Sequence, residues 1–190
     1  MKIQTAALLL SLTVIFSQCS LPGRVTAPVH TEPRAEEIKS RVVIKDYVAP
    51  RKINTKNVNP ESVVSLAESL QGKPYKWGGT SVEQGFDCSG LVYYVFKQNK
   101  IAVPRTSVEY TNAGKEIPLT EAKRGDIILF TGSDANSGKV GHMGLITLND
   151  HGKIQFINAI EGDAGVTVCK LSGYFIPRFV KVIRVFNTNS

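Results

Sequence analysis

Cys88 and His142 are the residues of this chain whose types and settings best suit covalent catalysis. Cys88 stands where a stretch rich in glycine and aromatic residues gives way to an apolar run with helical spacing. His142 opens a strand-like run after a loop of polar residues. A thiol paired with an imidazole forms a nucleophile and its base. The sequence therefore predicts a cysteine hydrolase with Cys88 as the nucleophile and His142 as the base.

The position of Cys88 at the start of a predicted helix bears on the chemistry of its thiol. A helix N-terminus carries partial positive charge and unpaired N–H groups, and both stabilise a thiolate. We expect the pKa of the Cys88 thiol to lie below its ordinary value, with Asp87 or a residue before it as the helix cap. The N–H groups of the same turn are the predicted oxyanion donors.

Asn158 is the predicted third member of the site. Residues 142–148 and 153–160 are typical of the two strands of a hairpin whose turn lies near residue 150. In such a hairpin Asn158 lies opposite or diagonal to His142, on the same face. We expect its side-chain oxygen to accept a hydrogen bond from Nδ1–H of His142 and to fix the tautomer of the ring. Without the hairpin, Asn158 would be a turn or edge residue without a role.

The remaining histidines and cysteines predict no metal site. His30 lies in a proline-rich segment and His151 in the predicted hairpin turn, and the chain has no ligand spacing typical of zinc. We therefore expect neither a metal nor a cofactor. Cys169 lies in an alternating, strand-like stretch and is predicted to be a small core residue, with a disulfide to Cys88 as the alternative.

The apolar periodicity predicts an α+β domain of helices packed on an antiparallel sheet. Asn59 and Pro60 are typical of a helix start, and Glu109 can complete a capping box with Thr106. Loop 132–141 is rich in Gly, Ser and Asn, so we expect a mobile rim there. Helices are predicted over residues 60–70, over 88–99 and from Thr106, and strands over residues 41–48, 126–131, 142–148, 153–160 and 180–186.

Residues 1–18 are predicted to be a signal peptide of the lipoprotein type. An apolar run over residues 6–16 is too short to cross a membrane as a mature helix, and it ends just before Cys19. Lipidation of Cys19 would attach the protein to a membrane, and Ser20 resembles the signal for delivery to the outer membrane, facing the periplasm. Residues 19–57 are then a basic tether and residues 58–190 a single domain. A plain secretory signal is the alternative.

The formal net charge of +7 is concentrated near the N-terminus. Residues 20–57 hold eight Lys or Arg against four Asp or Glu, whereas residues 58–190 hold 14 against 12. A basic tether can lie against anionic lipid or wall polymer, and a solvated linker is the alternative. The chain lacks a basic patch interleaved with aromatic residues, so nucleic acid is not an expected partner.

Six short motifs follow one another along the chain: Pro74-Tyr75-x-Trp77-Gly78-Gly79, Asp87-Cys88-Ser89-Gly90, Pro104-Arg105-x-Ser107, Gly125-Asp126-Ile127, Gly141-His142-x-Gly144 and Phe156-Ile157-x-Ala159. Over residues 60–186 their order resembles that of the NlpC-type cell-wall cysteine peptidases. The resemblance implies a compact papain-like fold. It also implies hydrolysis of amide bonds in peptidoglycan stem peptides, between γ-D-glutamate and diaminopimelate or at crosslinks, through a thioester intermediate. The residues that it places near the substrate or the oxyanion are Tyr75, Asp87, Ser89, Arg105 and Ser107.

Two other functions stay open from the sequence. An amidase or acyl transferase could use the same fold and residues, and a lipoprotein with an inactive site could bind wall peptides. The presence of Cys88, His142 and Asn158 together argues against the inactive form. We expect an enzyme that acts as a monomer on peptidoglycan stem peptides while its N-terminal lipid holds it at the membrane.

Overall fold

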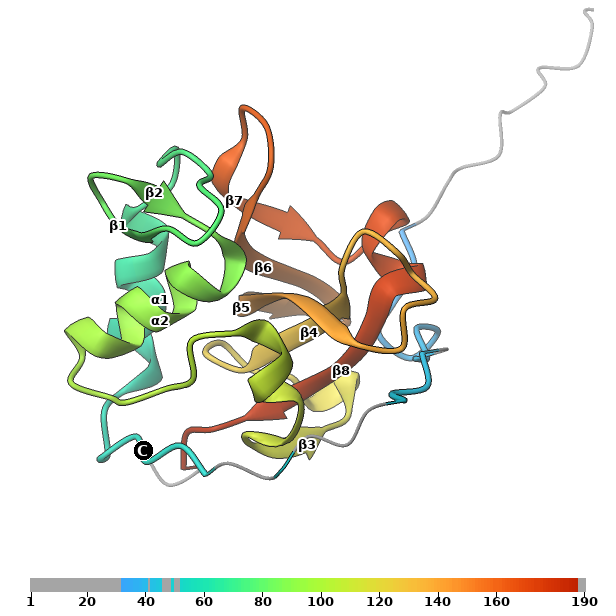
Figure 1. Ribbon diagram of the computed structural model, residues 1–190. Coiled ribbons are helices and arrows are strands. Elements are labelled where there is room, and N and C mark those ends of the chain that lie inside the picture. The colour runs from blue at the N-terminus through green and yellow to red at the C-terminus, as the bar shows by residue number, and fades with distance from the viewer. Residues whose placement is uncertain (1–31, 41, 46–48, 50–51, 188–190) are drawn as a thin grey trace, which may run out of the picture. The chain divides into compact units, whose positions relative to one another are not determined.

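The computed structural model describes residues 32–40, 42–45, 49 and 52–187 (Figure 1). The predicted signal peptide and Cys19 lie outside these residues. In the described part of the chain, no helix is long and apolar enough to cross a membrane. The elements in chain order are α1 Pro60–Ser69, β1 Thr80–Ser81, β2 Gly85–Phe86, α2 Cys88–Gln98, η1 Ser107–Asn112, β3 Lys115–Ile117, η2 Leu119–Glu121, β4 Ile127–Thr131, β5 Val140–Asp150, β6 Lys153–Ile160, β7 Gly165–Lys170, η3 Gly173–Arg178 and β8 Phe179–Arg184.

Helices α1 and α2 begin where their capping residues predict. The side chain of Asn59 accepts a hydrogen bond from the N–H of Glu61 at 2.9 Å, and Pro60 takes the first helical position. Asp87 caps α2 by accepting a hydrogen bond from the N–H of Gly90 at 2.6 Å. These predicted helix starts are confirmed, and the second of them fixes the position of the thiol.

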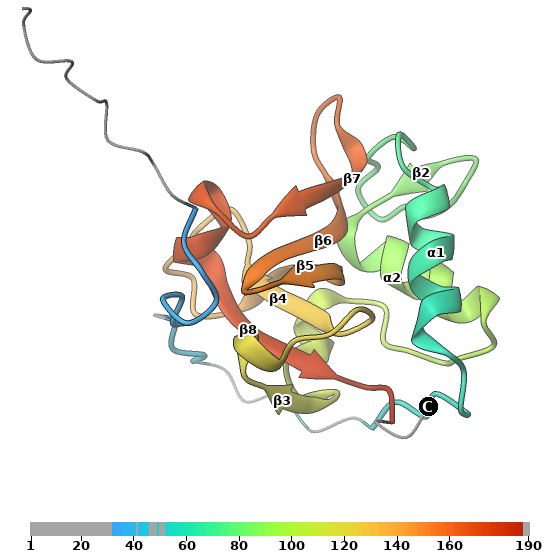
Figure 2. The same ribbon diagram turned by 180° about the vertical axis from the view of Figure 1, so that it is seen from behind.

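Six strands form one sheet in the order β3-β8-β4-β5-β6-β7, and every neighbouring pair is antiparallel. Helices α1 and α2 lie beside each other on one face of this sheet (Figure 1 and Figure 2). Alternate residues of β4 point to opposite faces: Leu129 joins the core under the helices, and Phe130 joins a second core on the other face. The predicted α+β class, with helices on an antiparallel sheet, is confirmed.

A bulge at Thr147 interrupts the predicted hairpin of β5 and β6 and sets its register. Beyond the bulge, Leu145 pairs with Ile157. One extra residue in a strand exchanges the faces that all the following residues occupy. Without the bulge, His142 and Asn158 would point to opposite faces of the sheet. With it, they share the face of the second core.

Part of the segment predicted as a tether packs against the sheet. Ala35 and Ile38 are buried in the second core, and the N–H of Ala35 donates to the carbonyl of Gly152 at 2.9 Å. The strand predicted over residues 41–48 is not formed at residues 42–45, and its other residues lie outside the described chain. The first described residues therefore pack on the face of the sheet opposite the helices.

Gly90 allows the loop before β1 to approach α2, and its replacement should separate the two. A Cβ atom at Gly90 would overlap the carbonyl oxygen of Gly79, which accepts a hydrogen bond from the N–H of Asp87 at 3.2 Å. We expect Gly90→Ala to lower the free energy of unfolding by about 1–3 kcal/mol. Gly132→Ala is the control, because the nearest atom to its new Cβ would lie at 3.8 Å. Equal urea midpoints for Gly90→Ala and the wild type would contradict the close approach.

Candidate active site

Cys88 is the first residue of α2, and its thiol lies against strand β5. The backbone N–H groups of Met143, Ser89 and Cys88 lie close enough to the sulfur to act on its pKa. Since Met143 directly follows His142 in the chain, the start of the helix and the His142 end of β5 lie together. Helix α2 therefore brings the thiol to the strand that carries the imidazole.

Asn158 holds the His142 ring, with Nε2 of the ring 2.9 Å from Oδ1 of the amide. The predicted contact between the two side chains is confirmed, but the prediction named Nδ1 as the bonded nitrogen. The difference follows from register: Asn158 lies across from Gly144, so the ring extends diagonally and meets the amide with its outer nitrogen. Nδ1 is thereby left free of the amide.

Burial shifts the pKa values of the Cys88 thiol and of the His142 imidazole toward their neutral forms. Burial lowers the pKa of His142 below 6.5, an effect that the hydrogen bond with Asn158 offsets in part. Burial also raises the pKa of Cys88 to about 11, and the charge of Asp87 adds to the increase. The N–H groups around the sulfur act in the opposite direction but are outweighed. The predicted fall in the thiol pKa is therefore wrong, and activation of Cys88 depends on proton transfer to His142.

The pH dependence of activity should report this neutral pair. kcat/KM should fall as the pH drops through the His142 pKa, below 6.5, because a protonated ring cannot accept the thiol proton. It should stay level above 6.5, because the thiol ionises by itself only near pH 11. In Cys169→Ser protein, alkylation of Cys88 by iodoacetamide should accelerate up to that pH. A rate that levels off near neutral pH would indicate a thiolate–imidazolium pair.

Asp87 joins the residues around the start of α2. Its carboxylate accepts hydrogen bonds from Arg105 at 2.8 and 3.1 Å and from the N–H of Gly78 at 2.9 Å. The buried Ser89 hydroxyl donates to Asp87 at 3.2 Å and accepts from Arg105 at 3.0 Å. Burial raises the pKa of Asp87, but the bonds from Arg105 and Gly90 outweigh it and lower the pKa. Asp87 and Ser89 stabilise the start of α2 through these hydrogen bonds. The Arg105 side chain, in contrast, remains 34% exposed to solvent.

Tyr75 lies close enough to Cys88 for their charges to interact. Burial raises the pKa of Tyr75 to about 12, and the charges of Cys88 and Glu161 contribute. The Tyr75 hydroxyl therefore stays protonated and can donate a hydrogen bond. Ser107 is the first residue of η1, which Thr106 caps with the predicted capping box, although the helix is of the 3-10 type. Within the described residues, no hydrogen bond joins Ser107 to Cys88.

Aromatic side chains form a wall beside the His142 ring that the sequence did not reveal. Phe175 of η3 stacks on the imidazole, with centroids 6.2 Å apart and planes at 24°. Phe130 lies 5.9 Å from the imidazole, and Phe156 contacts both phenylalanines. Phe175 is far from His142 in the chain, so no local pattern could have linked them. These phenylalanine side chains, on the side of the second core, limit how far the plane of the His142 ring can rotate.

Loop 132–141, the predicted mobile rim, makes two hydrogen bonds with distant segments of the chain. The Arg178 guanidinium donates to the carbonyl of Ser133 at 2.9 Å, and the N–H of Lys45 donates to the carbonyl of Gly138 at 3.0 Å. Both contacts come from distant segments, and the mobility of the loop stays a prediction. The loop therefore connects η3 and the N-terminal segment to the strand that carries His142.

Cys88 and Cys169 are both free thiols, so the alternative of a disulfide between them is wrong. Cys169 is half-buried and packs at the edge of the second core. Across the described ranges, no group of three or more His, Cys, Asp or Glu side chains could hold a metal ion. The described groups next to the Cys88 thiol are backbone N–H donors, the Tyr75 phenol and the strand that carries His142.

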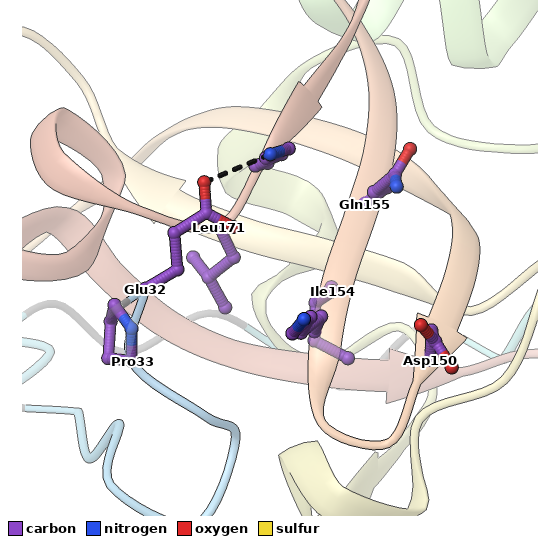
Figure 3. Close-up of a pocket in the computed structure, with 8 residues that line it drawn as sticks. Glu32, Pro33, Asp150, Ile154, Gln155 and Leu171 are labelled. Carbon is purple, nitrogen blue, oxygen red and sulfur yellow. Dashed lines mark hydrogen bonds and ion pairs between the residues drawn. The ribbon is translucent and has the colours of Figure 1, made fainter. Parts of the chain in front are cut away.

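A small pocket lies at the far end of the β5–β6 hairpin from Cys88 (Figure 3). Asp150 and Lys153 line it from the hairpin turn. Glu32 and Lys170 complete its charged lining and form an ion pair at 3.0 Å. These charges balance, and the pocket contains no nucleophile. It is therefore separate from the thiol chemistry.

A model of the NlpC/P60 family matches residues 72–184, which include Cys88, His142 and Asn158. The bifunctional muramidase/DL-endopeptidase CwlT of Bacillus subtilis is 35% identical over 139 residues, covering 68% of this chain and 40% of the relative. The murein DD-endopeptidase MepH of Escherichia coli is 36% identical over 134 residues, covering 67% and 47%. The chain thus spans less than half the length of either relative.

A solved structure shares the arrangement of helices and strands. The peptidoglycan hydrolase RipB of Mycobacterium tuberculosis superimposes with a TM-score of 0.56 at 31% identity, covering 70% of this chain and 71% of that one. The papain-like arrangement of helices on an antiparallel sheet, which the motifs implied, is confirmed by this agreement.

Proposed function

This chain belongs to the NlpC/P60 family, and we propose that it is a cysteine endopeptidase that hydrolyses amide bonds in peptidoglycan stem peptides. One observation supports the proposal most directly. The Cys88 thiol at the start of α2 lies against the N–H of Met143, beside His142, whose ring is bonded to Asn158. Family relatives described as a DL-endopeptidase and a murein DD-endopeptidase support the same class of reaction.

The proposed reaction begins with transfer of the thiol proton from Cys88 to Nδ1 of His142. The sulfur then bonds to the carbonyl carbon of the scissile amide, and N–H groups at the start of α2 and the Tyr75 hydroxyl stabilise the negative oxygen. His142 gives its proton to the leaving amine, and the C–N bond breaks to leave a thioester. Water that has lost a proton to His142 hydrolyses the thioester and restores the thiol.

We propose the bond between γ-D-glutamate and diaminopimelate as the first candidate, with a crosslink bond as the alternative. Arg105 is suited to a carboxylate of the stem peptide, because its guanidinium is partly exposed while Asp87 fixes its orientation. Tyr75 and Ser107 are proposed to contact the same peptide. Ser89 supports them through its bond to Arg105.

Digestion of purified sacculi tests the reaction and the bond together, with mass spectrometry of the soluble products. Cleavage within the stem should give disaccharides that keep only the L-Ala–D-Glu dipeptide. Cleavage of crosslinks should convert dimers into monomers with unshortened stems. Whole peptides freed from the glycan would indicate an amidase, and products joined to an added amine an acyl transferase. Binding to sacculi without any product would contradict the enzyme and support a wall-binding lipoprotein.

We also propose that lipid on Cys19 holds the protein at the cell envelope, at the outer membrane facing the periplasm. The support is the apolar run of residues 6–16 followed by Cys19. A single acyl chain anchors only marginally, so stable attachment needs several chains. Cys19→Ala should release the protein from the membrane fraction or block its processing. An unmodified mature N-terminus downstream of Ser20 would contradict the anchor and leave the endopeptidase proposal untouched.

A further inference from the structure

We propose that Cys169 is a positioning residue that, together with the Thr167 carbonyl, holds the Asn158 amide in the orientation that sets which nitrogen of His142 carries the proton. The inference rests on the proposed thiol chemistry of Cys88 and His142. Cys169 lies on β7, next to the strand that carries Asn158. Its sulfur accepts a hydrogen bond from Nδ2 of Asn158 at 3.4 Å.

The surroundings of the Asn158 amide distinguish its nitrogen from its oxygen. Nδ2 has two hydrogens and two acceptors, the Cys169 sulfur and the Thr167 carbonyl at 3.1 Å, both on β7. Oδ1 faces Nε2 of His142 at 2.9 Å. Since Asn158 is fully buried, a lost partner cannot be replaced by solvent. Half a turn of the amide would place Oδ1 against the Thr167 carbonyl, which cannot donate.

The orientation of the amide determines the tautomer of His142. An oxygen opposite Nε2 requires the proton on Nε2, and Nδ1 then keeps a lone pair for the thiol. An amide nitrogen opposite Nε2 would instead require the proton on Nδ1. That tautomer cannot accept the proton of Cys88. Cys169 therefore acts on the base through Asn158, without touching the reacting atoms.

The variants Cys169→Val and Cys169→Ser separate hydrogen bonding from packing. Valine keeps an apolar side chain of similar size but has no acceptor, whereas serine keeps an acceptor. We expect Cys169→Val to lower kcat about 3- to 10-fold at unchanged KM, the factor expected for one lost hydrogen bond. Cys169→Ser should restore kcat to within about twofold. Lys170→Gln is the control on the same strand, because Lys170 is exposed and lies outside the site, and it should leave kcat unchanged.

Nitrogen-15 NMR of the His142 ring, at a pH where it is neutral, reads the tautomer without substrate. The wild type and Cys169→Ser should carry the proton on Nε2, and Cys169→Val should show a share of ring protonated on Nδ1. Unchanged ring signals or an unchanged kcat in Cys169→Val would overturn the proposal. If the wild type hydrolyses no wall peptide but the ring signals shift as expected, the proposed function fails and the positioning role stands.

Discussion

Cys88→Ser is expected to abolish peptidoglycan hydrolysis while the fold is retained. Oxygen takes the place of sulfur with little change in volume, but a hydroxyl is a far weaker nucleophile at neutral pH. His142 has a lowered pKa and is a weak base, so it cannot compensate. We expect kcat/KM on sacculi to fall by roughly 10⁴-fold or more. Circular dichroism and the urea midpoint should match those of the wild type, because the oxygen can keep the N–H partners of the sulfur.

Cys169→Ser is the matched control for this prediction. Cys169 is the second free cysteine of the described chain, and the chemical exchange is the same. The variant should remain active, because serine can accept the hydrogen bond of Asn158. Wall-lytic activity that persists in Cys88→Ser would end the proposed mechanism. Loss of activity in Cys169→Ser with activity retained in Cys88→Ser, both with intact folds, would mean that the nucleophile has been assigned to the wrong thiol.

The start of α2 could be predicted because its signals are local. Asp87 has the side chain of a good N-cap, and the apolar residues after Cys88 repeat with a helical period. The same holds for Asn59 and Pro60 at α1, whose start agrees with the prediction and whose end lies one residue earlier. Strand β6 likewise has the predicted bounds, residues 153–160. Capping and periodicity act within a few residues, so one sequence is enough to read them.

The register of the site could not be read in the same way. An even separation between His142 and Asn158 suggested a shared face, but the observed hairpin needs the bulge at Thr147 to achieve it. A bulge depends on the packing of the whole sheet and has no local signal in this stretch. The register also determines that Nε2 and not Nδ1 of His142 meets Asn158, so this contact could not be predicted from the sequence either. The contact of Phe175 with the ring also required the fold, because it joins segments distant in sequence.

The charge state of the thiol is a second property that local sequence could not supply. The position of Cys88 at a helix N-terminus predicts a lowered pKa, and its N–H partners do act in that direction. The opposing effect is burial under β5, which only the tertiary structure contains. Because desolvation is the larger effect here, the pKa of the thiol is raised and not lowered.

His142→Ala is expected to reduce turnover far more than Asn158→Ala. Removal of His142 takes away the proton acceptor for a thiol whose pKa is about 11, so we expect a loss of roughly 10³- to 10⁴-fold in kcat. Removal of Asn158 leaves the ring against Phe175 and Phe130, which still restrict its plane. Only the selection of the tautomer is lost, and a residue that orients a functional group typically contributes about 10- to 100-fold.

The comparison needs correction for stability, because Asn158→Ala also leaves the Thr167 carbonyl without its partner inside the protein. That loss should cost about 1–3 kcal/mol in the free energy of unfolding, so kcat has to be measured where both variants are fully folded. Asn136→Ala, at an exposed position of loop 132–141, is the control and should leave both quantities unchanged. Equal losses of kcat in His142→Ala and Asn158→Ala would mean that Asn158 takes part in proton transfer itself. If Asn158 only orients His142, kcat should fall less in Asn158→Ala than in His142→Ala. The fall of activity at low pH should be preserved in Asn158→Ala, because it reports the protonation of the His142 ring.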